Sequence, residues 1–350
     1  MERSLEMQTP AGEGSPAAGG SDERPAGERM RLGGALLTMA ALVAALVVVS
    51  RLVSIPWLLT LQNIVGLALF AIATNLLIGY TGLVSFGQAA FYGTGAYAVA
   101  IGWLHFKAPF WLGFVAAPLV GAAAALGVGL LALRARKLYF ALLTLAFSQL
   151  FYVVAEQEYT VTNGANGIFG PMIPAALTDP YLGFYFVLAV GALCMLALWK
   201  ITESPFGLTL RAIRENRERA EALGVNVFRH QLLAFVISGV FCAIAGVLFV
   251  VHDQSAYPEL LDWTKSGDPV LMAVIGGMYA FLGPAAGALF YQLAHDFIVQ
   301  QTRSWQLVLG LVLLAVVLFV PDGFSGLFAR LGERLRGRRQ PGRDRPRAAA

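Results

Sequence analysis

Four residues with hydrogen-bonding side chains recur at helical spacing in one apolar stretch of the chain. Taken as a helix at about 100° per residue, Thr81, Ser85, Gln88 and Tyr92 share one face. A polar stripe on a membrane helix usually faces the interior of a helix bundle. The stripe therefore predicts a pathway wall that offers donors and acceptors to a zwitterionic solute. The alternative is close packing of small residues with hydrogen bonds between helices.

Two neighbouring stretches add polar residues to this prediction. Asn75 precedes the stripe, and its primary amide has donors and acceptors that must all find partners, so it is kept as a pathway candidate. Thr144, Ser148 and Tyr152 lie on one face of a second apolar stretch. Hydroxyl side chains in membrane helices often bond back to their own backbone, and we expect this of Thr144 and Ser148.

A long polar connection at 203–229 carries a second kind of signal. Its middle has strong helix propensity, and Ile213, Ala220 and Leu223 can form an apolar side among charged residues. Gly224 follows as a helix-ending glycine. The pattern predicts a short amphipathic docking helix on the cytoplasmic side. The alternative is a solvated, charged loop that only anchors the topology.

The sequence holds no pattern for covalent chemistry. It contains no GxxxxGK[ST] and no HExxH, and its four histidines are far apart, so neither a P-loop nor a metal site is expected. Cys194 and Cys242 lie in apolar runs, where packing explains them. An intramembrane carboxylate is a functional candidate by default, but Asp296 lies near the end of its segment and is not included. Transport or channel function therefore leads over catalysis.

The amino-acid composition indicates what class of protein carries these residues. Hydrophobic residues make up 57% of the 350 residues and charged residues only 13%, against roughly 45–50% and about 25% in average soluble domains. So few polar groups cannot cover the surface of a soluble domain, and disorder needs low hydrophobicity. The fold class predicted is an all-α polytopic membrane protein.

Ten apolar segments predict about ten transmembrane or partly re-entrant helices. Three of them, the third, eighth and ninth, are rich in glycine and are expected to be short or interrupted. A five-residue similarity between 87–91 and 283–287 fits an inverted repeat or simply small-residue packing. The expected segments are 33–53, 57–79, 83–103, 110–133, 138–156, 181–200, 231–251, 268–282, 284–300 and 304–320.

The distribution of basic residues predicts orientation. With ten spans, 21 of the 25 Lys and Arg residues fall on the side of the termini, which predicts that both termini are cytoplasmic. Residues 1–31 read as a disordered cytoplasmic tail, with a signal peptide over 33–50 as the rival, and 32–328 as the transmembrane domain. The basic tail at 329–350 fits an anchor near anionic lipid better than a nucleic-acid-binding segment.

Several of these stretches resemble one known family. The segment NLLIGYTGLVSFGQAAFYGTGAY at 75–97 is similar to the signature of branched-chain amino-acid ABC importer permeases of the M-type (LivM-like). RAIRENRERAEALGVNVFRHQLLAFVISG at 211–239 resembles the family's coupling region, a variant of the EAA loop, and VTNGANGIFG at 161–170 resembles its outer loop. The resemblance extends from about residue 60 to 328, through IGGMYAFLGPAAGALF and FVPDGFSGLF.

The resemblance implies a permease subunit of an ATP-driven importer in a bacterial inner membrane. It implies a second, H-type permease subunit, two cytoplasmic ATPases and a periplasmic binding protein. ATP and Mg would bind the ATPases, and no cofactor is expected on this chain, which is itself not an enzyme. Residues implied in ATPase coupling are Arg214, Glu215, Glu218, Ala220, Glu221, Ala222 and Gly224.

Departures from the family's pattern leave the solute open. Gln88 stands where many members have His, and Asn163, Ala165 and Asn166 replace a more usual Gly, Ser and Asp. Members of the family also import urea, short amides and aromatic acids.

A stand-alone channel or a secondary carrier is the rival from another functional class. An ion-coupled carrier would need buried ionisable residues, which the central segments are expected to lack. A purely structural scaffold would leave the polar stripe unexplained.

Overall fold

The computed structural model describes residues 40–135, 138–302, 307–308, 310–311 and 314. Contacts divide the chain into two units, 1–44 and 45–350, and the second holds the features described below. Of the first unit only residues 40–44 are described, and they are helical. The predicted tails at 1–31 and 329–350, most of the tenth apolar segment and the start of the first lie outside the described residues.

Five helical stretches in the described part of the chain are long and apolar enough to cross a membrane. They coincide with the second, fourth, fifth, sixth and seventh segments expected from the sequence. The first is α2 (Ile55–Asn75), which continues as the π-helix η1 (Leu76–Thr81). The others are α4 (Phe110–Ala132), α5 (Leu138–Gln157), α8 (Pro180–Thr202) and α11 (Val227–Asp253). The chain is thus a helical multi-pass membrane protein.

The third segment is not one continuous helix, so the predicted helical stripe is wrong in its geometry. The π-helix ends at Gly82, whose φ of 72° turns the chain out of the helix, and α3 begins only at Gln88 (Gln88–Phe106). The backbone between them finds side-chain partners: the N–H of Phe86 donates to Thr144 Oγ1 at 3.2 Å and that of Gly87 to Ser85 Oγ at 3.3 Å. Residues 82–106 are called the first interrupted segment below.

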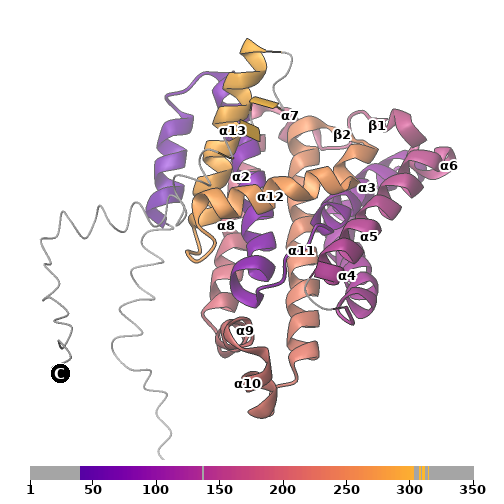
Figure 1. Cartoon of the computed structure of the whole chain (residues 1–350). Coiled ribbons are helices and arrows are strands. Elements are labelled where there is room, and N and C mark those ends of the chain that lie inside the picture. Colours follow the sequence, from indigo (N-terminus) through magenta and orange to yellow (C-terminus); the bar gives the residue numbers. More distant parts are fainter. Residues whose placement is uncertain (1–39, 136–137, 303–306, 309, 312–313, 315–350) are drawn as a thin grey trace, which may run out of the picture. The chain divides into compact units, whose positions relative to one another are not determined.

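The eighth segment has the same construction. After α11 the chain forms the short strand β2 (Ser255–Ala256) and the 3-10 turn η3 (Pro258–Leu261), and only then α12 (Trp263–Gly276). Residues 254–276 are the second interrupted segment. In Figure 1, α12 lies across the direction of α2 and α11. The helix starts earlier than the expected 268–282 because Asp262 caps it, accepting from the N–H of Thr264 at 2.8 Å.

The ninth segment differs from what its glycines predicted, since α13 (Gly283–Gln301) is a continuous helix. Its glycines serve close packing instead. A Cβ at Gly287 would lie 1.8 Å from the carbonyl oxygen of Met272, so α12 and α13 touch backbone to backbone. At Gly246 a Cβ would lie 1.9 Å from the carbonyl oxygen of Tyr92, which brings α11 equally close to α3. The repeat in construction therefore relates the third and eighth segments rather than the third and ninth.

Small elements cover the end of the molecule where β2 lies. These are α6 (Tyr159–Thr162), η2 (Gly164–Asn166), the strand β1 (Ile168–Phe169) and α7 (Ala175–Thr178). The antiparallel pair β1–β2 sets Ile168 opposite Ala256 and so fastens the glycine-rich loop at 161–170 to the second interrupted segment.

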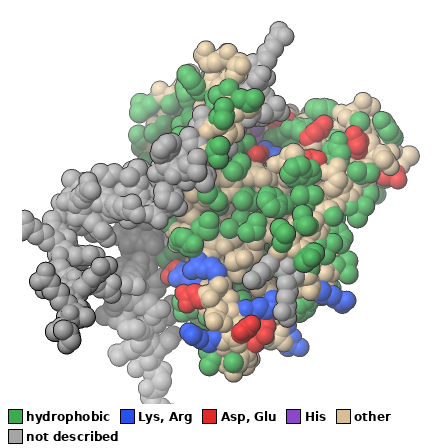
Figure 2. Space-filling model, in the orientation of Figure 1, with side chains coloured by type: hydrophobic (Ala, Val, Ile, Leu, Met, Phe, Trp, Pro, Cys, Tyr) green, Lys and Arg blue, Asp and Glu red, His purple; other side chains and the backbone are tan. Residues whose placement is uncertain are grey.

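The polar connection at 203–229 forms two helices instead of one. α9 (Pro205–Glu215) ends at Asn216, whose φ of −156° and ψ of 101° break the expected rod, and α10 (Arg217–Ala222) follows. The break is stabilised locally because Asn216 Oδ1 accepts from the N–H of Arg219 at 2.8 Å, as an N-cap does. Figure 2 shows Lys, Arg, Asp and Glu side chains gathered around α9 and α10, next to a broad hydrophobic surface.

Candidate functional site

A cavity of about 670 Å³ lies among α2, α3, α11, α12 and α13. Its wall combines two kinds of surface, which is typical of sites for solutes with a polar and an apolar part. The polar lining consists of Asn63, Tyr92, Tyr257, Glu259, Thr264, Lys265, Asp268, Tyr291, Gln292 and His295. The rest is formed by Leu67, Phe249, Leu260, Leu271 and Gly310.

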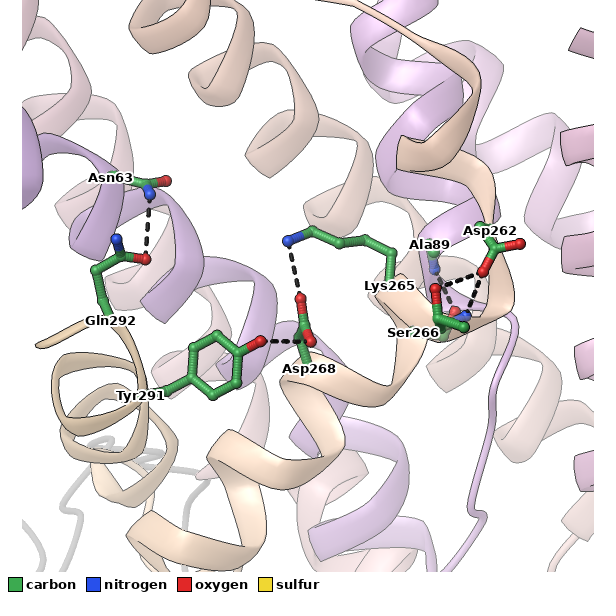
Figure 3. Close-up of polar contacts among 9 residues, drawn as sticks. Asn63, Ala89, Asp262, Lys265, Ser266, Asp268, Tyr291 and Gln292 are labelled. Atoms are coloured by element: carbon green, nitrogen blue, oxygen red, sulfur yellow. Dashed lines mark hydrogen bonds and ion pairs between the residues drawn. The ribbon is translucent and has the colours of Figure 1, made fainter. Parts of the chain in front are cut away.

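Asp268 is the hub of the charged side of this cavity. Lys265, one helical turn earlier on α12, places its Nζ 2.8 Å from Asp268 Oδ2. The hydroxyl of Tyr291 on α13 donates to Asp268 Oδ1 at 2.7 Å (Figure 3). Lys265 and Asp268 keep 28% and 18% of their side-chain surface exposed, so neither charge is fully desolvated. The arrangement leaves ammonium and carboxylate groups at the edge of open space.

A second polar chain joins α2 to α13 on the other side of the cavity. Asn63 Nδ2 donates to Gln292 Oε1 at 3.2 Å (Figure 3), and Gln292 Nε2 donates to Asp296 Oδ1 at 2.7 Å. The ring of His295 lies 3.2 Å from the same carboxylate oxygen, and Thr60 Oγ1 donates to Asp296 Oδ2 at 3.4 Å. The carboxylate that the sequence placed near the end of its segment is therefore part of the wall that supports the cavity.

The first turns of α3 and α12 meet beside the cavity. The N–H of Ala89 donates to Ser266 Oγ at 2.8 Å, and the side chain of Ser266 is buried (Figure 3). Ser266 follows Lys265 directly, so this bond connects the start of α3 with the charged part of α12. The two interrupted segments thus touch at the places where their helices begin.

Of the five pathway residues predicted from the sequence, Tyr92 is the one that lines the cavity. It is buried, and its ring packs against Phe70 and Phe249 at centroid distances of 4.6 and 6.0 Å.

Ser85 and Gln88 lie in a closed, uncharged network. Gln88 Nε2 donates to Ser85 Oγ at 3.2 Å, and Gln88 Oε1 lies 3.1 Å from Ser238 Oγ and 3.4 Å from Cys242 Sγ on α11. All four side chains are buried. The amide of Gln88 is already bonded to neighbours within the protein.

Asn75 and Thr81 lie at the other end of α2, where η1 follows. Thr81 Oγ1 donates back to the carbonyl of Leu77 at 2.5 Å, so its hydroxyl is used within its own helix. Asn75 Nδ2 donates to the carbonyl of Met278 at 3.0 Å, in the turn between α12 and α13. Its Oδ1 is buried without a hydrogen bond in the described part of the chain. Asn75 therefore joins the end of α2 to the end of α12.

Of the two hydroxyls predicted to bond to their own helix, one does so and the other does not. Thr144 Oγ1 donates to the carbonyl of Ala141 at 2.9 Å, as expected. Ser148 Oγ instead donates to the carbonyl of Leu261, 113 positions away, at 2.8 Å, so the prediction is wrong for Ser148. Tyr152, on the same face, donates to Glu156 Oε1 at 3.0 Å.

The residues that the sequence reasoning missed are the charged ones. The sequence gives no role to Lys265 or Asp268. Both lie within the first two turns of α12 and line the cavity, where their side chains remain partly exposed. The available signal was their spacing, three residues apart directly before the apolar run of the eighth segment.

The docking residues predicted on 203–229 separate into exposed and buried ones. The exposed ones are Glu215, Glu218, Glu221, Ala222, Leu223 and Gly224. Ala220 is buried against Ile213 and Val227, so its methyl group holds α9, α10 and α11 together. Gly224 has φ of 84°, and the N–H groups of Val225 and Gly224 bond the carbonyls of Ala220 and Glu221. The predicted left-handed helix ending at Gly224 is confirmed, and it is a Schellman motif.

Arg214 points toward η1 and the turn after α12. Its guanidinium donates to the carbonyl of Gly79 in η1 and lies 5.1 Å from the ring centroid of Tyr279. Gly79 precedes the first interrupted segment and Tyr279 follows the second. A single side chain of α9 therefore contacts residues that flank both segments.

Comparison with known proteins agrees with these features. The model of the family described as branched-chain amino acid transport system / permease component matches residues 58–318. The LivM permeases of the high-affinity branched-chain amino acid transport systems of Salmonella typhimurium and Escherichia coli are each 27% identical. They align with 82% and 83% of this chain and 74% and 73% of their own lengths.

A relative with another printed solute matches over a shorter stretch. The guanosine ABC transporter permease protein NupQ of Bacillus subtilis is 28% identical over 35% of this chain and 41% of its own length. The family match, by contrast, covers most of the chain, including both interrupted segments, the cavity and the α9–α10 connection. The chain therefore belongs to the family of permease components of branched-chain amino acid transport systems.

Proposed function

We propose that this chain is the permease subunit of an ATP-driven importer that moves branched-chain, or related hydrophobic, amino acids into the cell. The family match and the two LivM relatives support the solute class. The observation that carries the proposal is the cavity, whose lining combines Lys265 and Asp268 with apolar residues that include Leu67 and Phe249. A free amino acid with an apolar side chain presents the same two kinds of surface.

The importer would contain partner chains, because this chain has no P-loop in its sequence. We propose a second, H-type permease subunit, two cytoplasmic ATPases that bind ATP and Mg, and a periplasmic binding protein. The exposed residues of α10 and Leu223 would form the docking surface for an ATPase. Arg214 would then transmit movement of α9 to η1 and to the turn after α12.

We place the importer in a bacterial inner membrane, with about ten membrane passes and both termini in the cytoplasm. The asymmetry of basic residues along the sequence supports this orientation. Charged side chains clustered around α9 and α10 (Figure 2) fit the cytoplasmic face, where they would meet anionic lipid and the ATPases.

A secondary carrier is the second candidate, and the ion pair in the cavity is what favours it. Ionisable residues within a membrane protein are typical of ion-coupled transport as well as of solute binding. Importers of urea, short amides or aromatic acids within the same family are the further alternatives for the solute. The two mechanisms differ in their energy source, which is measurable.

The decisive experiment is purification of the tagged chain in mild detergent, followed by reconstitution with all subunits that accompany it. We expect ATPase subunits to co-purify and leucine uptake to require ATP inside a cytoplasm-like compartment. Uptake that proceeds without ATP and follows an ion gradient would contradict the importer and support the carrier. Urea or an aromatic acid transported in place of leucine would correct the solute class.

A further inference from the structure

The charges of the cavity do not balance. Its wall carries the carboxylates of Glu259 and Asp268 and the ammonium of Lys265, which leaves a formal net charge of −1 with His295 neutral. His295 lies against Asp296, so it belongs to the supporting chain on α13. A solute that enters this space therefore meets one positive and two negative groups, and a simple anion is disfavoured.

A ligand can separate Lys265 from Asp268 and bind each of the two charges. Both side chains keep part of their surface exposed, and ion pairs that solvent can reach are weak, so a ligand can separate the two groups. An ammonium has three donors, and one of those of Lys265 is used for Asp268. Asp268 is held in place independently by Tyr291, so its carboxylate stays in position when Lys265 moves.

We infer that this cavity binds the backbone charges of a free α-amino acid, with Lys265 taking the α-carboxylate and Asp268 together with Glu259 taking the α-ammonium. This assignment rests on the proposed function and names the part of the solute that the permease itself recognises. Leu67, Phe249 and Leu271 supply the apolar surface for the side chain. Recognition therefore depends on both charges of the solute and only loosely on the shape of its side chain.

A purely structural ion pair would predict a different pattern. It would make Lys265 and Asp268 important for stability and irrelevant for discrimination between solutes. The assignment instead predicts that removing either charge from the solute, or its partner from the protein, has the same effect on binding. Charge-assisted hydrogen bonds of this kind are stronger than neutral ones, so the loss is measurable.

The test measures thermal stabilisation by leucine of the chain purified with its accompanying subunits, without the binding protein. Leucine at millimolar concentration is expected to raise Tm, because it binds the folded state. Leucinamide, which lacks the carboxylate, and 4-methylpentanoate, which lacks the ammonium, are expected to have little effect. Lys265→Met and Asp268→Asn should each raise the half-saturating leucine concentration at least tenfold.

Two further variants make the result interpretable. Lys265→Arg keeps the positive charge and is expected to restore most of the leucine effect. Lys200→Met makes the same chemical change at the exposed end of α8 and should leave it intact. The inference is overturned if leucine fails to stabilise the wild-type complex, if both analogues stabilise it equally well, or if Lys265→Met responds like the wild type.

ATP-driven uptake separates this inference from the proposed function. If the reconstituted wild-type complex takes up no leucine, the proposed function is wrong. If the wild type takes up leucine and Lys265→Met does so at the same rate, the function stands and the cavity assignment is wrong.

Discussion

The two interrupted segments share one construction and differ in their chemistry. Each starts as non-helical chain inside the protein and continues as a helix, and their helices meet at Ala89 and Ser266. Segment 82–106 contains no Asp, Glu, Lys or Arg, whereas segment 254–276 contains four of them. The polar groups of Ser85 and Gln88 are bonded within the protein, whereas those of Lys265 and Asp268 border a cavity.

The difference shows that a network of uncharged polar groups can be buried completely, whereas a charged pair stays close to water or a ligand. Neutral amides and hydroxyls lose little by complete burial once each is hydrogen-bonded. Charges pay a desolvation cost that pairing often fails to offset, so they stay near water or a ligand. We therefore interpret the first segment as the packed, structural partner and the second as the one that contacts the solute.

The largest effect is expected where each segment packs backbone to backbone against a neighbouring helix. Gly246→Ala and Gly287→Ala would each drive a methyl group into a carbonyl oxygen of the facing helix. We expect each to destabilise the protein by about 3 kcal/mol or more, at the upper end for overpacked cores, and to reduce the yield of folded protein. Thermal unfolding in detergent measures this.

Gly127→Ala is the matched control, because nothing lies within 4 Å of a Cβ at that exposed position of α4. It should change stability by less than about 1 kcal/mol. Helix propensity favours Ala over Gly, so an equal loss in all three variants would show that close approach to the facing helix is not the cause. Tolerance of Gly287→Ala alone would show that α12 can move away from α13.

The next effect tests whether the two segments are moved together. Arg214→Ala removes the contacts with both Gly79 and Tyr279. Coupling between sites is typically about 1–3 kcal/mol, or 5–150-fold, so we expect leucine uptake per bound ATPase to fall about tenfold. ATPase association, measured by co-purification, should remain normal. Arg217→Ala, which loses only an exposed pair with Glu221, is the control.

Loss of ATPase association in Arg214→Ala, with uptake lost in proportion, would show instead that Arg214 only maintains the docking surface. Normal leucine uptake in Arg214→Ala would show that Arg214 does not transmit movement of α9 to either segment.

A smaller effect separates packed from solute-facing amides. Gln88→Leu removes the two buried hydrogen bonds of this amide to Ser85 and Ser238, and we expect this loss to cost about 1–3 kcal/mol. Each hydroxyl keeps one other bond, to the N–H of Gly87 and to the carbonyl of Ala73. Gln292→Leu should cost less, since Asn63 and Asp296 border the cavity and can bond water there. Comparing the Tm values of the two variants tests which amide is structural. A larger decrease in Tm for Gln292→Leu would reverse the structural and solute-facing assignments.

Leucine uptake by Ser85→Ala and Gln88→Leu tests the pathway role predicted for the polar stripe. Both variants are expected to slow uptake without blocking assembly. If both transport at the wild-type rate with a normal yield of the complex, Ser85 and Gln88 have no role in the pathway.

The smallest effect concerns the Schellman motif after α10. A left-handed conformation costs an L-residue about 1–2 kcal/mol, so Gly224→Val should fray the end of α10 and weaken ATPase association modestly. Gly224→Asn, a residue that tolerates this conformation, should behave almost like the wild type. A Gly224→Val variant that binds the ATPases normally would remove this helix end from the docking surface.

The sequence predicted those features that each depend on one stretch of chain. Long apolar runs required helices, and Gly224 marked a helix end that needs positive φ. Thr144 was correctly expected to bond its own backbone, because a hydroxyl in a membrane helix has few other local partners. Such features are set by neighbours in sequence, and these are visible in a pattern.

The features that the sequence did not predict depend on distant partners. Ser148 reaches Leu261 and Arg214 reaches Gly79, and no spacing rule encodes either contact. The 100° periodicity failed at 82–87 because a tertiary hydrogen bond to Thr144 and a local one to Ser85 replaced those of the helix. Lys265 was missed because α12 begins at Trp263, five residues before the expected start at 268, and this start depends on the cap at Asp262. Asp268 was missed because its partner Tyr291 comes from a distant part of the chain.

One helix, α5, has a consequence for the biogenesis of this protein. Thr144 accepts the backbone N–H of Phe86, and one turn later Ser148 donates to the carbonyl of Leu261. Backbone that is not helical cannot enter lipid alone, because its polar groups then have no partners. Residues 82–87 leave the ribosome before α5, and residues 254–262 leave it after. During membrane insertion the first segment therefore lacks its hydrogen-bond partner until α5 has been synthesised. The second segment is synthesised when α5 is already present.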